Sequence, residues 1–463
     1  MTGLILLDSF SKEPLYMQLY RHFKSEIEQN KCNAGDKLPS IRWLANNLSV
    51  SKITVEKAYQ QLVSEGYVSS RSRSRYVVNK LEEAAIRPYT ALVSKEYEPF
   101  GQRNVRYDFA SGEMDSDGFD FSLWKRYINK AFLDKNRLMG YGNSKGEEEL
   151  RREIVNYIRS RGVYCHREQI VVGPGVQNLL NILCSILQVE HNSIAFEEPG
   201  FTNGRRVWAD WGFTIVPVRM RQDGIDTDEL IRSGVKLVYL TPSHQFPTGY
   251  VMPIGKRTRL LKWAQQTGAV IIEDDYDSEF RYFGRPIPAL KGLDNEGSVV
   301  YLGSFSKVIP PSIRLSYMVL PDQLRERYEQ NSPLYNQAVS TIEQLALAQY
   351  MADGQLERQI RRLRKLYCEK QLLFMETIKR IFGSRADVKG TGSGLHIVLT
   401  VKSALSPREM FLKAMEQGCR IAPIQNYYLA AVPENLPQVI LYFSKIPSGE
   451  METAIKLLKD AWF

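Results

Sequence analysis

The first 80 residues carry a helical pattern of apolar positions. Apolar side chains recur every four residues from 15 to 27, which predicts an amphipathic helix over residues 14–29. Two shorter apolar stripes follow, and each begins just after a serine that suits a helix N-cap, Ser40 and Ser51. Gly66 provides a left-handed terminator for the last helix. Two helices around a tight turn indicate a helix-turn-helix, a common DNA-binding motif.

A pair of short strands is expected after these helices. Tyr67–Ser70 and Tyr76–Val78 are short strand-forming runs, joined by a tract in which arginine alternates with serine. Such a hairpin would form a wing whose arginines contact phosphates or the minor groove. The start of the last helix is the part that enters a major groove. The candidate DNA-binding residues are therefore Ser40, Arg42, Ser51, Lys52, Thr54, Lys57, Arg71, Arg73 and Arg75.

The charge of this segment also favours a nucleic-acid partner. Residues 1–80 hold 12 Lys or Arg and seven Asp or Glu, and so contribute +5 of the chain's net charge of +9. A basic end on a nearly balanced body is typical of proteins that bind nucleic acid. A solvated basic face would give the same count, so charge alone leaves both interpretations open.

The rest of the chain alternates short β-rich runs with helical stretches, which predicts an α/β domain with a mainly parallel sheet. Residues 81–105 have few periodic apolar positions and are interpreted as a linker. We therefore expect a winged helix-turn-helix domain over 1–80 and a large domain over 106–463. The predicted strands are Ile170–Val172, Ser193–Phe196, Leu237–Leu240, Ala269–Asp274 and Val299–Phe305.

Composition excludes several classes of protein. No stretch of about 18 uninterrupted apolar residues occurs, and the opening segment lacks a basic leader. The five cysteines are an odd number with no close pair, which argues against a disulfide framework and a cysteine-rich zinc site. We expect a cytoplasmic protein with no membrane segment.

A lysine follows one of the predicted strands in a loop rich in hydroxyl groups. Ser304, Ser306 and Lys307 lie together, and Arg314 comes seven residues after the lysine. A recessed lysine has a lowered pKa and forms an imine with an aldehyde, while hydroxyls and an arginine suit a phosphate dianion. Taken alone, such a segment is more often a surface lysine in a serine-rich loop.

An acidic cluster, residues 273–277, ends another predicted strand. A carboxylate there, Asp274, suits the protonated ring nitrogen of pyridoxal phosphate. A metal is the competing interpretation, but no histidine lies close in sequence and the spacing is not that of an EF-hand, so we expect no metal. Two further loops complete a cradle: Gly175, Val176 and Gln177 open a helix that can hold phosphate, and Phe201 offers a face for ring stacking.

Two resemblances follow from these motifs. Residues 13–78, with PLYMQLY, GDKLPSIRWLANNLSVSKITVEKAYQQLVSEGYV and YVV, resemble the winged helix-turn-helix of GntR regulators. From about residue 106 to 463 the chain resembles fold-type I aminotransferases, with a smaller C-terminal α+β subdomain, and the whole resembles the MocR branch of GntR regulators. Tyr141–Gly146 resembles the Y-G-x-x-x-G stretch near the dimer partner.

The resemblance implies a role for each site residue. Lys307 would carry pyridoxal phosphate as an internal aldimine, Asp274 would pair with the pyridine nitrogen, and Tyr276 would bond the phenolic oxygen. Phe201 would stack on the ring. The phosphate would be held by Ser304, Ser306, Arg314 and the backbone at Gly175, Val176 and Gln177.

The chain departs from the aminotransferase pattern at three places. Val176 stands where a hydroxyl residue is common, and Thr241–Gly249 replaces N-P-x-N-P-T-G, so that His244 or Gln245 would contact the cofactor oxygen unless the histidine only packs the loop. The arginine that clamps a substrate carboxylate has no counterpart in residues 438–443. Arg205 or Arg206 is the candidate for binding an effector carboxylate, with a surface salt bridge as the alternative.

Together these features predict a regulator that binds operator DNA and senses an amino compound, or pyridoxal phosphate itself, at Lys307. The resemblance implies a head-to-tail homodimer. Two alternatives stay open: a working aminotransferase with an attached DNA-binding domain, and a DNA-binding scaffold with a vestigial cofactor site.

Overall fold

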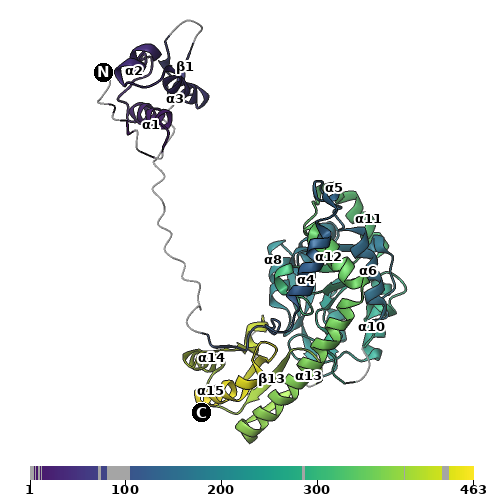
Figure 1. Ribbon diagram of the computed structural model, residues 1–463. Helices are drawn as coiled ribbons and strands as arrows, with labels where there is room; N and C mark the ends of the chain where they lie inside the picture. Colours follow the sequence, from purple (N-terminus) through teal and green to yellow (C-terminus); the bar gives the residue numbers. More distant parts are fainter. Residues whose placement is uncertain are drawn as a thin grey trace. The chain divides into compact units, whose positions relative to one another are not determined.

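The computed structural model describes residues 5, 7–8, 11, 13–70, 75–80, 105–283, 287–389, 392–429 and 437–463. Contacts divide the chain into two compact units, Met1–Pro99 and Phe100–Phe463, which are described separately (Figure 1).

The N-terminal unit contains the three helices that the apolar pattern predicts: α1 Leu15–Glu28, α2 Ile41–Asn47 and α3 Lys52–Ser64. The oxygen Oγ of Ser40 accepts the backbone N–H of Trp43 at 3.2 Å, and Oγ of Ser51 accepts that of Thr54 at 3.0 Å. Both serines are therefore N-caps, as expected. Gly66 follows α3 with φ +79°, the left-handed conformation of a helix terminator.

The inward faces of these helices form one core. Phe23 of α1 and Tyr59 of α3 are buried and meet edge to face, with ring centroids 5.6 Å apart. Strands β1 Val68–Ser69 and β2 Val77–Val78 pair antiparallel, so the expected hairpin is confirmed. Arg71 and Arg73, the expected wing-tip arginines, lie outside the described residues.

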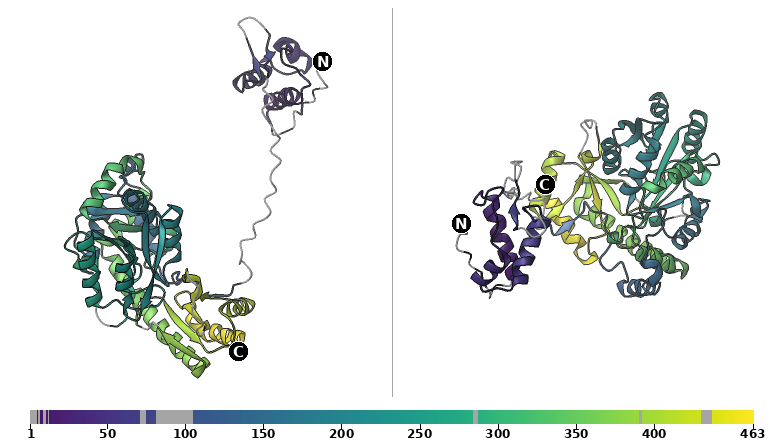
Figure 2. Two further views of the ribbon diagram at one scale, coloured as in Figure 1. Left: turned by 180° about the vertical axis from the view of Figure 1, so that it is seen from behind. Right: turned by 90° about the horizontal axis from the view of Figure 1, so that it is seen from above.

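The large unit is built on an eight-stranded sheet with helices on both faces (Figures 1 and 2). In spatial order the strands are β4 Ile170–Gly173, β11 Ser316–Val319, β10 Val299–Ser304, β9 Val270–Asp275, β8 Leu237–Leu240, β5 Ser193–Glu198, β6 Thr214–Arg221 and β7 Gly224–Ile225. All five predicted strands are present, and the sheet is mainly parallel.

Strand β11 runs antiparallel to both of its neighbours, β10 and β4, and the edge strand β7 runs antiparallel to β6. The short loop between β10 and β11 holds only one 3₁₀ turn, Pro311–Ile313. A parallel return would need a longer crossover, so the chain comes back antiparallel.

The helices of the large unit are α4 Phe121–Ala131, α5 Lys135–Leu138, α6 Glu148–Arg159, α7 Val176–Leu187, α8 Thr202–Asp210, α9 Thr227–Arg232, α10 Ile254–Thr267, α11 Asp322–Asn331, α12 Thr341–Ala352 and α13 Gln355–Phe382. Strand β3 Tyr107–Asp108 pairs with β14 Cys419–Arg420.

The C-terminal part forms the smaller α+β subdomain. Its antiparallel sheet has the order β12 Ala386–Lys389, β13 His396–Val401, β16 Gln438–Tyr442 and β15 Ala422–Pro423. Helices α14 Pro407–Glu416 and α15 Met451–Trp462 accompany it. Across the described part of the chain, none of the helices has the length and apolar character needed to span a bilayer.

Candidate functional site

The central parallel strands bring the predicted site residues to one edge. Strands β8, β9 and β10 are neighbours and point the same way, so their carboxyl ends lie side by side. The loop from Thr241, the turn at Tyr276 and the loop to Lys307 follow those three ends. Ligands of α/β sheets bind at this edge.

Asp274 is buried at the end of β9 with one unused oxygen. The hydroxyl of Tyr239 on β8 donates to its Oδ2, whereas Oδ1 has no hydrogen-bond partner among the described residues. Burial raises the pKa of Asp274 to about 7. A ring N–H placed at this carboxylate would supply the missing donor and favour the ionised form, so the residue fits the pyridinium of pyridoxal phosphate.

Lys307 lies in the loop after β10. Its Nζ donates to the carbonyl of Gly112 at 2.5 Å and lies 6.0 Å from the ring centroid of Tyr442. A Cβ at Gly112 would come within 2.8 Å of that nitrogen, so the glycine leaves the amine its space. Burial lowers the pKa of Lys307, which increases the share of neutral, nucleophilic amine.

Hydroxyl groups gather beside the lysine. The Oγ of Ser304 donates to Ser306 at 3.0 Å and accepts from Ser316 of β11 at 3.0 Å. The three serine hydroxyls hydrogen-bond to one another, and their oxygens suit a phosphate.

The start of α7 and an arginine complete this phosphate cradle. Gly175 is the N-cap of α7 with φ +107°, and a Cβ there would overlap the guanidinium of Arg314. Arg314 itself has φ +57°, an uncommon left-handed conformation for a non-glycine residue, and donates to the carbonyl of Pro174 at 3.1 Å. The helix start and the arginine therefore meet at one place, where an anion would be stabilised.

The other residues expected to contact the cofactor, Phe201, Val176 and Gln177, lie at the starts of α8 and α7. Phe201 precedes α8 and stacks on Tyr239, with centroids 6.1 Å apart and planes at 24°. Val176 is half-buried in the first turn of α7, and the side chain of Gln177 is exposed. The start of α7 therefore orients the backbone N–H groups of these two residues, and not their side chains.

His244 is buried next to Tyr276 and Asp277. Its Nδ1 lies 3.0 Å from the hydroxyl of Tyr276 and 2.9 Å from Oδ2 of Asp277. The structure thus brings His244 and Tyr276 together as the sequence suggests, and adds a carboxylate that sequence reasoning assigned no role.

The two candidate effector arginines differ sharply. Arg205 is only 2% exposed, lies 2.6 Å from Oε2 of Glu198, and donates to the backbone carbonyl of Tyr427 at 3.0 Å. Its salt bridge is buried, not on the surface. Arg206 is exposed on α8.

Several site residues carried no clear sequence signal. Tyr239 lies inside an apolar strand, Gly112 is far from Lys307 in sequence, Ser316 begins the unpredicted strand β11, and Tyr442 occupies β16. Their roles depend on which strands are neighbours in the sheet, and a single sequence does not reveal this.

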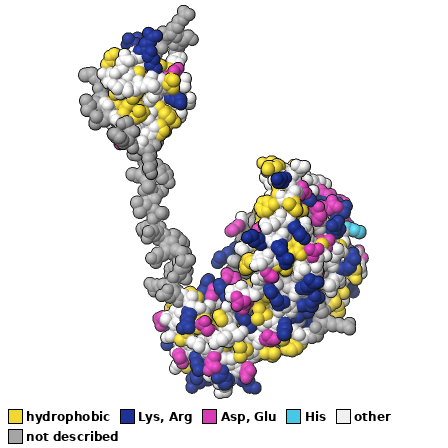
Figure 3. All heavy atoms as spheres, viewed as in Figure 1, with side chains coloured by type: hydrophobic (Ala, Val, Ile, Leu, Met, Phe, Trp, Pro, Cys, Tyr) yellow, Lys and Arg dark blue, Asp and Glu magenta, His cyan; other side chains and the backbone are white. Residues whose placement is uncertain are grey.

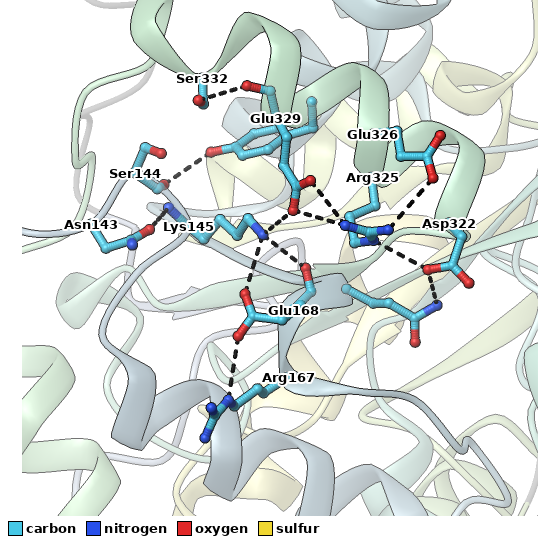
Figure 4. Close-up of polar contacts among 12 residues, drawn as sticks. Asn143, Ser144, Lys145, Arg167, Glu168, Asp322, Arg325, Glu326, Glu329 and Ser332 are labelled. Atoms are coloured by element: carbon cyan, nitrogen blue, oxygen red, sulfur yellow. Dashed lines mark hydrogen bonds and ion pairs between the residues drawn. The ribbon is translucent and has the colours of Figure 1, made fainter.

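The loop of the Y-G-x-x-x-G stretch is anchored by a charged cluster (Figure 4). The Nζ of Lys145 lies 2.6 Å from Glu329 and 3.3 Å from Glu168, and Arg325 holds Glu329 at 2.9 Å. The hydroxyl of Tyr328 donates to the carbonyl of Ser144 at 3.0 Å. These contacts fix the loop while leaving Tyr141, at its start, fully exposed.

The helix-turn-helix offers a mixed basic and apolar surface. Arg42, Lys52 and Lys57 are exposed, as are Trp43 at 52% and Ile53 at 64%. Figure 3 shows Lys and Arg side chains beside hydrophobic ones on this unit. Ser40 and Ser51 are the N-caps of α2 and α3. The backbone N–H and the hydroxyl of Thr54 both contact Oγ of Ser51, so these three residues stabilise the helix starts. Arg75 is also exposed and lies two residues before β2, the wing's second strand.

Comparison with known proteins agrees with this arrangement. Residues 15–78 match the bacterial regulatory proteins of the gntR family, and residues 106–436 match aminotransferase class I and II. The HTH-type transcriptional regulator YdeL of Bacillus subtilis is 39% identical over 454 residues, 97% of each chain. The probable rhizopine catabolism regulatory protein MocR of Rhizobium meliloti is 31% identical, over 99% of this chain and 96% of its own.

A solved structure shows the fold of the large unit. The multiple substrate aminotransferase of Thermococcus profundus superposes with a TM-score of 0.69 and 20% identity, over 78% of this chain and 91% of the enzyme. At that identity the likeness concerns the fold. Taken with the full-length relatives and the donor set around Asp274 and Lys307, it leads to one assignment. The chain belongs to the MocR-type branch of the GntR transcriptional regulators, which join a winged helix-turn-helix to an aminotransferase-like domain whose cofactor is pyridoxal phosphate.

Proposed function

We propose that this regulator binds operator DNA through residues 1–80 and senses an amino compound, or pyridoxal phosphate itself, at Lys307 of the domain 106–463. Residues 81–105 would link the two. The observation that carries the proposal is the combination, in one site, of a half-buried lysine of lowered pKa with an oxygen of Asp274 that has no hydrogen-bond partner among the described residues. A pyridinium aldehyde held between the two side chains would use both of them.

The residues would divide the work of holding the cofactor. Pyridoxal phosphate supplies an aldehyde that reacts reversibly with amines. Lys307 would provide the resident amine, and an effector amine would compete with it. Asp274 would keep the ring nitrogen protonated, while Ser304, Ser306 and Arg314 would hold the phosphate.

Weak turnover is part of the proposal. Strand β16, Gln438–Tyr442, contains no arginine, and the residue it places near Lys307 is the aromatic Tyr442. A substrate carboxylate therefore lacks the usual clamp, which removes an orienting contact that transamination needs. We infer that the domain senses amines and does not act as an enzyme, although a single half-reaction would remain chemically open to it.

An effector carboxylate would need another cation. Arg205 is committed to Glu198 and to backbone carbonyls, so of the two candidates Arg206 has the accessible side chain. We propose Arg206 for this role and Arg205 as the buried support of the loop before α8.

A head-to-tail homodimer would cover a strongly exposed apolar surface. Leu133 is 81% exposed, Met139 89%, Tyr141 fully exposed and Leu334 79%. Figure 3 shows hydrophobic side chains gathered where Figure 1 places α5. Patches of this kind mark association surfaces. A second copy is the occupant that the resemblance implies.

The test is an absorbance titration of the purified protein against amino acids and amines, run beside a steady-state assay for amino-donor turnover. The proposal expects a spectral change with at least one amine and a change in DNA affinity with the same compound. Turnover in the ordinary enzyme range of about 1–1,000 per second, with DNA binding unaffected, would favour the aminotransferase instead.

A further inference from the structure

Two buried side chains, His244 and Asp277, and the half-buried Tyr276 meet at one nitrogen beside the cofactor site. The Nδ1 of His244 lies 3.0 and 2.9 Å from the two carboxylate oxygens of Asp277 and 3.0 Å from the hydroxyl of Tyr276. His244 is 4% exposed and Asp277 is 3% exposed, so bulk water is largely excluded from both. An imidazole Nδ1 carries either a proton or a lone pair, and therefore cannot donate to one neighbour while accepting from another.

The packing around His244 holds its ring in place. Gly394, with φ +74°, approaches so closely that a Cβ there would overlap the imidazole and come within 2.8 Å of Asp277 Oδ2. On another side His396 lies with its ring centroid 5.5 Å away, and its Nε2 donates to the carbonyl of Pro247 at 3.0 Å. Burial lowers the pKa of His396 to about 4, so that ring is neutral.

The carboxylate decides where the proton lies. Two acceptor oxygens of Asp277 face Nδ1 of His244, so this nitrogen must carry hydrogen and donate to them. The hydroxyl of Tyr276 then cannot donate to Nδ1, and its own proton is free for another acceptor. Burial raises the pKa of Tyr276 well above 10, so the hydroxyl keeps that proton.

We propose that Asp277 and His244 form a positioning pair that makes Tyr276 a hydrogen-bond donor to the phenolic oxygen of pyridoxal phosphate, and so lowers the pH at which the bound cofactor loses its proton. This inference rests on the proposed function, because it takes Tyr276 to face the cofactor. It replaces the direct contact expected of His244: the histidine acts through the tyrosine.

Other charged and titratable groups also face this trio. They come from β5, from the end of β9 and the segment after it, from the loop after β10, and from β13 and β16. They are Glu197, Asp274, Tyr282, Lys307, His396 and Tyr442. None of them is altered in the variants below, so a change in midpoint reports on the pair and on Tyr276.

The experiment follows the visible absorbance of the cofactor-loaded protein as a function of pH. His244→Phe keeps an aromatic ring and removes Nδ1, leaving Tyr276 to donate to Asp277. We expect the midpoint to rise by about one pH unit, the scale of one hydrogen bond to a charged group. In a Tyr276→Phe background the same substitution should add no shift. Tyr127→Phe, which removes a hydrogen bond from a tyrosine hydroxyl to Asp353, is the matched control and should leave the midpoint unchanged.

Asp277→Asn gives a second route to the answer if His244→Phe does not fold. Loss of a carboxylate near Lys307 would by itself lower the midpoint, whereas loss of the positioning effect raises it. An upward shift thus supports the pair. An unchanged or lowered midpoint, or a His244→Phe shift that persists in the Tyr276→Phe background, would overturn it. If the wild-type protein shows no visible cofactor band, the proposed function itself fails first.

Discussion

At the scale of single residues, Lys307 is the decisive side chain. Its half-buried side chain donates from Nζ to the Gly112 carbonyl, and no other described lysine follows one of the central strands in this way. Lys307→Ala should abolish the visible band of the bound cofactor and the adduct that borohydride fixes. Peptide mass mapping of the reduced wild-type protein is the check, and an adduct on a different lysine would refute the assignment.

The burial of Asp274 leads to a pH-dependent prediction for the cofactor-free protein. Its folded pKa of about 7 lies above the ordinary value, so its contribution to stability is present at low pH and is lost as the pH rises through about 7. Asp274→Asn should therefore stabilise the cofactor-free protein at pH 8, by about 1–3 kcal/mol, while weakening its affinity for pyridoxal phosphate. Thermal denaturation at pH 5 and pH 8 measures the first effect.

A matched control for that prediction is Asp294→Asn. Asp294 lies 3.0 Å from Lys291 and accepts backbone N–H groups of Ser298 and Val299, and its pKa is lowered mainly by Lys291. Its contribution to stability is present at neutral pH and is lost as the pH falls. The two substitutions should thus shift stability at pH 8 in opposite directions. A loss of stability at pH 8 for both variants would show that the folded protein does not disfavour the ionised carboxylate of Asp274.

At the scale of elements, the start of α7 depends on Gly175. Gly175→Ala would place a Cβ against Arg314 at a backbone φ of +107°. We expect the dissociation constant of pyridoxal phosphate to rise about 5- to 150-fold, the range given by a strain of about 1–3 kcal/mol. Gly212→Ala is the control, because Gly212 has φ +83° with open space around it. Equal losses of cofactor affinity in both variants would contradict a specific cradle.

The exposed basic residues of α2 and α3 give a second prediction at this scale. Arg42, Lys52 and Lys57 are exposed around α2 and α3, where phosphates or base edges would lie. For each of the three that contacts a phosphate, substitution by alanine should flatten the log–log salt dependence of DNA binding by about 0.9. Lys31→Ala removes an exposed lysine after α1 and should leave the slope unchanged. A slope that stays the same in the triple variant would argue against this face.

The elements were more predictable than the contacts between them. Periodicity and caps gave the three helices of the first unit, and apolar runs gave five strands, because each signal is local in sequence. Strand β11 is not among the predicted strands, and a pattern of apolar positions carries no signal for its antiparallel direction. The pairing of His244 with Asp277 depends on β8 lying next to β9, and the burial of Arg205 depends on Glu198. Long-range adjacency of this kind has no signal in a single sequence.

At the scale of the whole molecule, one chain contains a DNA-binding part and an aminotransferase-like part. The full-length relatives show that the DNA-binding and aminotransferase-like parts occur together in regulators. If an amine at Lys307 changes the affinity for DNA, then DNA must change the affinity for that amine by the same factor. This reciprocity separates a sensor from an enzyme that happens to carry a DNA-binding domain.

The most direct test is the affinity for operator DNA, selected from genomic fragments with the protein itself, measured by fluorescence anisotropy with and without pyridoxal phosphate and the reactive amine. We predict that ligand at the site changes the DNA affinity of the wild-type protein by about 5- to 150-fold, and that Lys307→Ala, matched for folding, shows no such change. Equal affinity in every state of the wild-type site, together with sustained amino-donor turnover, would contradict this prediction.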